Sequence, residues 1–192
     1  SPGGPQIVHV FMPRDTPGYR IVDTWDTLGM RATKSDDTIL EGAFVPDRYI
    51  SRVVPPDFAG ADAFILGIFA WAEPTFASIY LGLAERAFDI AVEYAKTKKS
   101  IAMGDKSMAY NPMVQYAVAE ILLELEDIRP HVDRTAADWS TGVDHGGLWP
   151  AKLVATKYHA VEGARRIAKL ALDVVGGGGI FKSHELERLL RD

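Results

Sequence analysis

The sequence predicts a mainly α-helical protein in which an antiparallel bundle of long helices is joined to a small antiparallel β region. Two observations support this fold class. Before residue 60 the apolar residues come in short runs broken by turn-forming residues, whereas after it they recur at the helical period over long segments. Long amphipathic helices with short connections are typical of an antiparallel bundle. The boundary between the two regions is predicted between residues 58 and 59.

Three strands are predicted in the first region. The runs at 6–12 and 19–22 are separated by Asp-Thr-Pro-Gly at 15–18, whose proline and glycine suit the centre of a type II turn. A third run, 38–45, places apolar residues on both of its faces, so we expect both faces to be covered. So few strands are rarely stable without more strands or a covering layer.

Three long helices and a short one are predicted in the second region. The first covers residues 61–99. The second begins with Asn111 as N-cap and Pro112 at the first helical position. The third covers residues 150–175 and ends at Gly176, where a glycine can adopt the left-handed cap conformation.

Helical spacing also predicts which faces point inward. On the third helix the inward residues are expected to be Val154, Tyr158, Val161, Ile167, Ala168 and Leu172. The carboxylates of the second helix, Glu120, Glu124, Glu126 and Asp127, are predicted to form its solvated edge. A last short helix, residues 184–191, carries charges expected to pair along its surface.

Composition argues against several kinds of partner. The net charge is −5 without a long run of either sign, so no nucleic-acid surface is expected. The longest strongly apolar stretch, Phe64 to Ala72, is shorter than the roughly 20 residues of a membrane span. The five histidines are scattered through the sequence, so no metal site is predicted. The absence of cysteine agrees with a cytoplasmic location.

Two features carry alternative interpretations. The glycine run at 176–179 is either a flexible helix cap and turn, or bare backbone that a phosphate or a cofactor can approach closely. Glu73, set among apolar residues just before Pro74, is either a general base or a charge favoured by the dipole at a helix start. Neither pair of alternatives is decided by the residues alone.

Several short motifs follow one another in a characteristic order. Leu-Gly-Met-Arg at 28–31 precedes a strand that ends in Val-Pro at 45–46, and the helical segment 81–94 follows. The glycine run is then followed by an Arg-Asp pair at 191–192. This order resembles the flavin-dependent acyl-CoA dehydrogenases, from the second half of their middle β-domain through most of their C-terminal helical bundle.

The resemblance implies an oxidoreductase that oxidises the Cα–Cβ bond of an acyl-CoA thioester. In that family a glutamate removes the α-proton and FAD accepts the β-hydride. The family forms homo-oligomers, dimers or tetramers, in which the glycine turn and the end of the first bundle helix contact the FAD of a neighbouring subunit. Lys98, Asp173, Gly176 and Gly177 are the corresponding residues of this chain.

The chain departs from the family at the expected flavin contacts. Lys98, Ile101 and Ala102 stand where the family commonly has arginine followed closely by Phe-Gly, and Asp173 stands where glutamine is common. These departures weaken the expected contacts with adenine and pyrophosphate.

The position of the catalytic base also departs from the family. In one subgroup the glutamate lies on the first bundle helix, where this chain has Ala72, with Glu73 beside it. In the larger subgroup it comes shortly after the Arg-Asp pair, and this chain stops at Asp192. The sequence is therefore expected to be a fragment, with residues 1–58 from the middle β-domain and 59–192 from the helical bundle. Alone it is expected to bind FAD poorly and to be inactive.

Two rival functions stay open. One is a flavin monooxygenase or oxidase built on the same fold, because a fold does not determine the chemistry. The other is a non-catalytic partner subunit of a hetero-oligomeric dehydrogenase, for which Ala72 and the weakened flavin contacts are the motivating observations.

Overall fold

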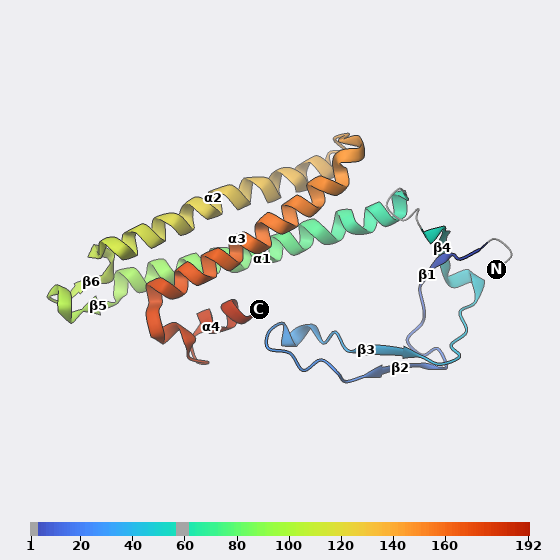
Figure 1. The fold of residues 1–192 in the computed structure, drawn as a ribbon, viewed down its shortest axis with the longest axis horizontal. Helices are drawn as coiled ribbons and strands as arrows, with labels where there is room; N and C mark the ends of the chain where they lie inside the picture. The colour runs from blue at the N-terminus through green and yellow to red at the C-terminus, as the bar shows by residue number, and fades with distance from the viewer. Residues whose placement is uncertain (1–3, 57–61) are drawn as a thin grey trace. The chain divides into compact units, whose positions relative to one another are not determined.

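The computed structural model describes residues 4–56 and 62–192, and it divides into two compact units, Ser1–Leu66 and Gly67–Asp192 (Figure 1). Within the described residues, four α-helices and short antiparallel strands confirm the predicted mainly α-helical class. The boundary predicted between residues 58 and 59 lies outside the described residues.

The first unit contains two separate two-stranded antiparallel ladders. Strand β1 (Ile7–Val10) pairs with β4 (Ile50–Val54), and β2 (Tyr19–Val22) pairs with β3 (Asp37–Leu40). The strands predicted at 6–12 and 19–22 are therefore present, the first of them shorter than expected. They follow each other in sequence but pair with different partners.

The turn before β2 depends on one glycine. The Tyr19 backbone N–H donates to the Thr16 carbonyl at 3.0 Å, so the turn covers residues 16–19 and has Pro17 and Gly18 at its centre, as predicted. Gly18 lies at its third position with a φ of 83°, the left-handed conformation that a type II turn requires. A Cβ there would overlap the carbonyl oxygen of Glu41, whose N–H is bonded to Gly18. Only glycine fits this position.

The prediction for residues 38–45 was wrong in two respects. Strand β3 ends at Leu40, and the chain bends at Gly42, whose φ is 64°. Leu40 and Phe44 are 54% and 77% exposed, so the face that carries them is open, whereas Ile39, Ala43 and Val45 of the other face are half-buried. Within the described part of this unit, the β2–β3 ladder is only two strands wide, which is too narrow to cover its own apolar side chains.

An acidic side chain joins β4 to the first helix. Asp62 accepts hydrogen bonds from the backbone N–H groups of Phe64 at 2.9 Å and Ile65 at 3.3 Å. It also pairs with Arg52 of β4, whose Nε lies 2.8 Å from Asp62 Oδ2. The hydrogen bond from Arg52 is the main reason why the pKa of Asp62 is lowered. Asp62 thus satisfies free N–H groups at the helix start while its own charge is neutralised.

The second unit is built from long helices that run back and forth. They are α1 (Ala63–Thr97), whose first four residues belong to the first unit, α2 (Pro112–Ser140), α3 (Trp149–Val175) and the short α4 (Glu185–Arg191). The Asn111 side chain accepts from the Met113 N–H at 2.9 Å, which confirms the predicted N-cap of α2. Gly176 ends α3 as predicted, but its φ of 72° and ψ of −158° are not those of the left-handed αL conformation. A small hairpin, β5 (Lys99–Ser100) with β6 (Lys106–Ser107), joins α1 to α2 and was not predicted.

The core of the bundle is lined by small residues on α1 and α3. The α3 face against the core carries Leu153, Ala160, Gly163, Ala164, Ile167, Ala171 and Val174. A Cβ on Gly163 would overlap Cδ1 of Ile128 on α2, so the two helices approach closely there. Val154 and Tyr158, predicted to point inward, are 58% and 60% exposed. The small residues set the rotation of α3, and a pattern that counts only large apolar residues misses them.

Ion pairs tie each helix to a neighbour. Two adjacent residues of α1 face opposite ways: Glu85 pairs with Arg129 of α2 at 2.7 Å, and Arg86 pairs with Glu185 of α4 at 2.6 Å. Glu124 of α2 pairs with Arg166 of α3. Glu124 is half-buried in this contact, and Glu120 is half-buried as well, so their prediction as part of a solvated edge was wrong, whereas Glu126 and Asp127 are exposed as expected. The α4 charges do pair along its surface, Arg191 with Glu187 at 3.3 Å.

Helix α1 is both long and apolar. Of the helices in the described residues, it alone has both the length and the composition of a membrane span, with 22% of its most apolar window buried. The sequence argument from the shorter stretch at 64–72 is therefore corrected, because length and composition by themselves do not exclude a membrane. Ala77, Ala84, Ala87 and Ala91 of the same helix lie in the bundle core.

Candidate functional site

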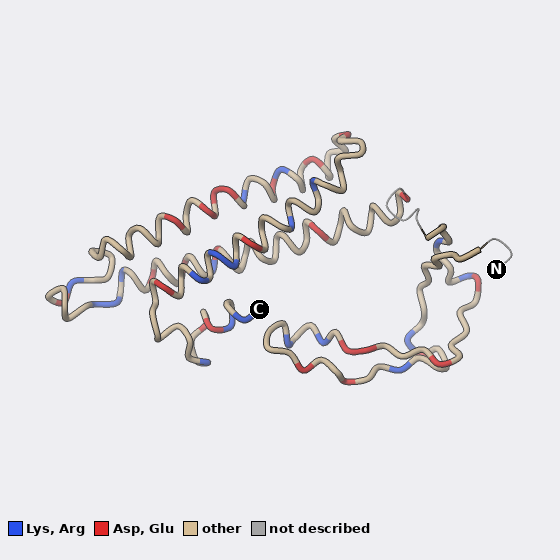
Figure 2. The backbone as a smooth tube through the Cα atoms, in the orientation of Figure 1, with Lys and Arg blue, Asp and Glu red and all other residues tan. Residues whose placement is uncertain are grey.

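The first half of α1 presents one carboxylate on an apolar surface. Glu73 is the only charged residue between Ala63 and Ala84. Figure 2 draws the first half of α1 almost entirely in tan, the colour of the uncharged residues. Its neighbours Trp71 and Phe76 are exposed and Ala72 is half-buried. Glu73 itself is half-buried, and in the described part of the chain it forms no hydrogen bond or ion pair. It lies within α1, which continues through Pro74, so it is not at the first turn of a helix as one interpretation required.

Lys98 lies where α1 ends. Its backbone N–H donates to the Tyr94 carbonyl at 2.9 Å, and its carbonyl accepts from the Met108 N–H at 2.8 Å. These bonds hold the backbone between α1 and the β5–β6 hairpin, while the side chain is exposed. Lys99 and Lys106 extend from the same hairpin, so this end of the bundle carries several positive charges.

The glycine run forms a tight turn at the end of α3. Residues Gly176–Ile180 form a 3-10 helix in which the first three glycines are exposed and have open space where a side chain would be. Gly179 is different, because a Cβ there would crowd Leu172 and Leu186. Asp173 is exposed one turn earlier on α3. The run is therefore both a packed turn and a stretch of accessible backbone.

The four predicted cofactor residues share one end of the bundle. The C-terminal end of α1 with its hairpin and the C-terminal end of α3 lie at the same end in Figure 1. Their side chains make no direct hydrogen bond or ion pair to one another among the described residues. Bare backbone at Gly176 and Gly177 and a cation at Lys98 fit a phosphate-bearing cofactor. The carboxylate of Asp173 fits hydroxyl or amino groups, from which it can accept hydrogen bonds, but repels phosphate.

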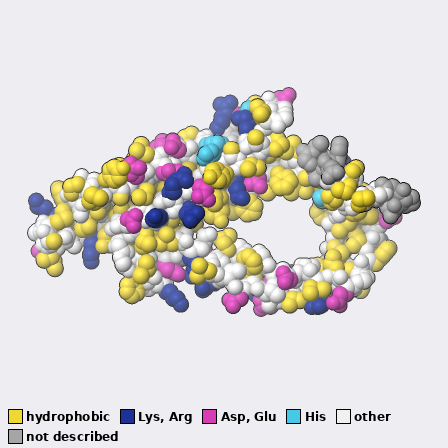
Figure 3. All heavy atoms as spheres, in the orientation of Figure 1, with side chains coloured by type: hydrophobic (Ala, Val, Ile, Leu, Met, Phe, Trp, Pro, Cys, Tyr) yellow, Lys and Arg dark blue, Asp and Glu magenta, His cyan; other side chains and the backbone are white. Residues whose placement is uncertain are grey.

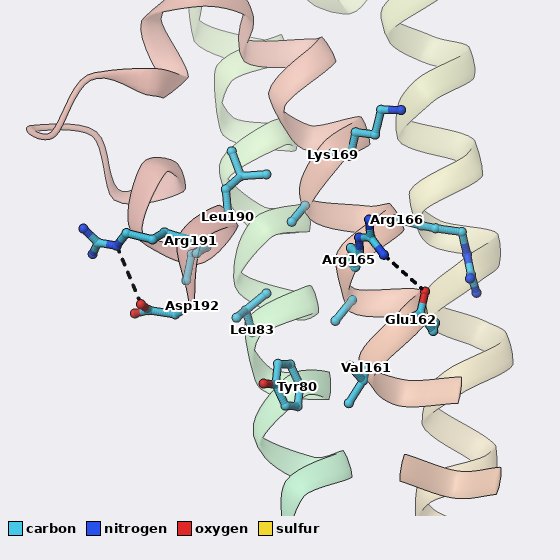
Figure 4. A pocket seen from close by; sticks show the side chains of 13 residues that line it. Tyr80, Leu83, Val161, Glu162, Arg165, Arg166, Lys169, Leu190, Arg191 and Asp192 are labelled. Atoms are coloured by element: carbon cyan, nitrogen blue, oxygen red, sulfur yellow. Dashed lines mark ion pairs between the residues drawn. The ribbon is translucent and has the colours of Figure 1, made fainter. Parts of the chain in front are cut away.

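A groove of about 650 Å³ lies between α1, α3 and α4 (Figure 4). Its apolar lining comes from Tyr80 and Leu83 of α1, from alanines of α3, and from Leu189 and Leu190 of α4. Its charged lining comes from α3 and the chain end. These residues are Glu162, Arg165, Arg166, Lys169, Arg191 and Asp192. The groove contains none of the four predicted cofactor residues.

The cations of the groove are partly neutralised. Arg166 pairs with Glu124, Arg165 lies 3.8 Å from Glu162, and Arg191 pairs with Glu187. On the face drawn in Figure 3, basic side chains gather over α3. The sequence analysis did not single out this set, although Arg165 and Lys169 lie four residues apart and so share one side of a helix.

No group of three or more metal-ligating side chains occurs in residues 4–56 and 62–192. The histidines do not all stand apart, however. His131 of α2 and His159 of α3 have ring centroids 5.4 Å apart, with an angle of 41° between the ring planes. Partial burial, together with His159 and Lys152, lowers the pKa of His131 below its usual value. The sequence could not show this pair, because the two residues come from different helices.

Comparison with known proteins begins with a family model described as "Acyl-CoA dehydrogenase, C-terminal domain", which matches residues 74–192. The curated relatives include Probable acyl-CoA dehydrogenase YngJ of Bacillus subtilis, 27% identical over 97% of this chain and 46% of that protein. They also include cyclohexane-1-carbonyl-CoA dehydrogenase of Geobacter metallireducens, 26% identical over 93% of this chain and 44% of that protein. The chain thus spans about half the length of these relatives.

Solved structures show the same fold. An acyl-CoA dehydrogenase from Geobacillus kaustophilus matches with a TM-score of 0.81 and 22% identity, covering 95% of this chain and 45% of that one. Butyryl-CoA dehydrogenase from Megasphaera elsdenii matches with a TM-score of 0.81 and 20% identity, covering 96% of this chain and 45% of that one. At this identity the likeness establishes the arrangement of helices and strands.

Proposed function

This chain belongs to the acyl-CoA dehydrogenase family, and on that basis we propose that the protein oxidises the Cα–Cβ bond of an acyl-CoA thioester with FAD as cofactor. The observation that carries the proposal is the match of residues 74–192 to the C-terminal domain of the family. Because the chain spans about half of its relatives, the proposal concerns the activity of a protein that has the family's remaining parts as well.

The residues of this chain would hold the cofactor from a neighbouring subunit of a homo-oligomer. FAD, when bound, supplies the acceptor for the β-hydride. Gly176 and Gly177 let a pyrophosphate come close to the backbone, because no side chain stands in the way. Lys98 supplies a positive charge for a phosphate, and Asp173 accepts hydrogen bonds from ribose hydroxyls or the adenine amino group.

Removal of the α-proton needs a carboxylate that faces the substrate. Within this chain Glu73 is the candidate, since it has no partner among the described residues and lies on an otherwise uncharged stretch of α1. A carboxylate that follows the Arg-Asp pair, as in the larger subgroup of the family, is the alternative position. In either case the base takes the proton from Cα while the thioester carbonyl stabilises the resulting carbanion.

The test is anaerobic titration, with acyl-CoA thioesters of straight, branched and cyclic chains, of a purified protein that contains this chain together with the family's remaining parts. We expect a visible flavin spectrum that bleaches with a matching thioester, together with formation of the enoyl-CoA. In a parallel aerobic assay, oxygen consumption with a hydroxylated product would show a monooxygenase reaction and would contradict the proposed dehydrogenation. If the protein is colourless and copurifies with a homologous chain, the proposed activity is wrong, and the protein is instead the non-catalytic partner subunit.

A second class of substrate has a specific observation in its favour. L-prolyl-[peptidyl-carrier protein] dehydrogenase of Pseudomonas fluorescens is 26% identical over 97% of this chain and 45% of that protein. We therefore propose carrier-protein thioesters as the alternative to CoA thioesters. The same titration distinguishes them, because an acyl-carrier substrate would bleach the flavin where the matching acyl-CoA does not.

A further inference from the structure

The geometry of α2 and α3 points to a two-histidine site for a divalent transition-metal ion such as Zn²⁺ or Cu²⁺, formed by His131 and His159. Neutral imidazole is a preferred ligand of zinc, copper and nickel in proteins. The site would be open, with two protein ligands and the remaining coordination positions available to water. It lies apart from the residues proposed to hold the flavin, and it does not depend on the proposed function.

The distance between the rings suits chelation. A tetrahedral ion bound to two imidazole nitrogens at about 2.0–2.1 Å separates the ring centroids by roughly 5 Å. The observed separation of the two centroids is 5.4 Å. Neither ring forms a hydrogen bond or an ion pair within the described residues, so both are free of competing partners. An ion could therefore be bound with small rotations of the side chains.

The helices hold the two residues opposite each other. On one side of the pair, Thr135 and Thr156 are joined by a buried hydrogen bond of 2.8 Å between their hydroxyl groups. On the other side, Ile128 packs where Gly163 leaves room for it. These contacts fix the register of α2 against α3 on both flanks of the histidines. Such prior ordering lowers the entropy that binding has to overcome.

The side chains around His131 and His159 affect how tightly a metal ion can bind. Tyr158 packs edge-on against the His159 ring with centroids 5.6 Å apart, which restrains that ring. Lys152 of α3 places a positive charge close enough to act on His131, and this charge opposes a cation. Histidine side chains are visible on the face drawn in Figure 3. His159 is exposed and His131 is half-buried.

The test is calorimetric titration of the folded protein with zinc chloride. Because chelation needs both rings, we expect His131→Gln and His159→Gln each to weaken binding by about tenfold or more, and the double variant to be little worse than either. His9→Gln, in the other unit, is the control and should bind as the wild type does. Lys152→Gln should bind more tightly. Losses that simply add, or that are equally large in the control, would overturn the site.

A second measurement needs no variant that could fail to fold. Substoichiometric Cu²⁺ broadens the NMR signals of the histidine rings that bind it. We expect the His131 and His159 ring signals to broaden first, and chelation with EDTA to restore them. Earlier or equal broadening of His9, His145 and His184 would overturn the assignment.

Discussion

A carboxylate within an otherwise apolar stretch of helix is kept there only if something compensates for its desolvation or uses its charge. Glu73 has no cation beside it among the described residues, whereas Asp62, Glu85 and Glu124 each have an arginine. That contrast is the reason to regard Glu73 as a group that acts on a ligand.

The corresponding prediction concerns catalysis. Glu73→Gln keeps the shape of the side chain and removes its ability to accept a proton, so kcat for acyl-CoA oxidation should fall by about 10²–10⁴-fold. The measurement is steady-state oxidation of the best substrate found, with an artificial electron acceptor that reoxidises the flavin, and the control is Glu93→Gln, an exposed glutamate of the same helix. An unchanged kcat would place the base elsewhere in the protein.

Asp138 shows the opposite situation, a buried carboxylate with full compensation. It accepts from His145 Nε2 at 2.8 Å and pairs with Arg134 Nε at 2.7 Å, which joins the end of α2 to the loop before α3. The bond from His145 is the first reason why the pKa of Asp138 is lowered, and Arg134 is the second. Trp149 packs edge-on against His145 at 4.9 Å between centroids.

This lowered pKa predicts a dependence of stability on pH. The carboxylate of Asp138 contributes stability at pH values above its usual pKa of 3.8, and the contribution is lost as the pH falls through the lower pKa of the folded state. Asp138→Asn should therefore be less stable than the wild type at neutral pH, with a difference that narrows in acid. Urea unfolding at several pH values measures it. Asp127→Asn, an exposed carboxylate on the same helix, should show little difference at any pH.

For the helices, local signals in the sequence predicted where they begin and end, but not how they pack. Asn111 and Gly176 were identified correctly because capping depends on a few adjacent residues. The inward face of α3 was wrong at Val154 and Tyr158 because close approach to α2 at Gly163 sets the rotation of that helix. A contact between two helices cannot be predicted from the sequence of either helix alone. The ion pairs of Glu85 with Arg129 and of Arg86 with Glu185 were therefore also missed.

Two glycines of the helices allow this packing argument to be tested. In Gly163→Ala the added Cβ would overlap the buried Ile128, which should lower the free energy of unfolding by about 1–3 kcal/mol. The higher helix propensity of alanine should offset about 1 kcal/mol of this loss. Gly82→Ala on α1 is the matched control, because nothing lies within 4 Å of the added Cβ. It should stabilise the protein by up to about 1 kcal/mol. Thermal and urea unfolding compare the two, and equal shifts would contradict the close approach.

For the whole molecule, the sequence predicted the fold class and the family correctly, and much less about the site. Motif order survives in the chain even where pairwise identity is low, as the match over residues 74–192 shows. The cofactor residues Lys98, Asp173, Gly176 and Gly177 are exposed and make no contacts that reveal a ligand. Their proposed roles would involve a second subunit, and no pattern within one chain shows which groups that subunit would contribute.

A prediction at this scale concerns retention of the flavin. If Lys98 attracts a phosphate of a neighbouring subunit's FAD, Lys98→Glu should lower the flavin content of the purified protein and raise the dissociation constant by about tenfold or more, in a manner that depends on salt. Absorbance after gel filtration at several salt concentrations measures it. Lys152→Glu, near the start of α3, is the control and should keep its flavin. Equal losses in both variants would point to net charge alone.

The fluorescence of Trp71, on the apolar face of α1, can show whether that face is covered. Trp71 is 72% exposed and lies two residues before Glu73, whereas Trp149 is buried. Indole fluorescence shifts to shorter wavelength when water is removed from the ring, so any ligand, domain or subunit that covers this face should shift the emission of Trp71. In a folded variant whose only tryptophan is Trp71, the emission wavelength would follow, in real time, the binding of a ligand or subunit to α1.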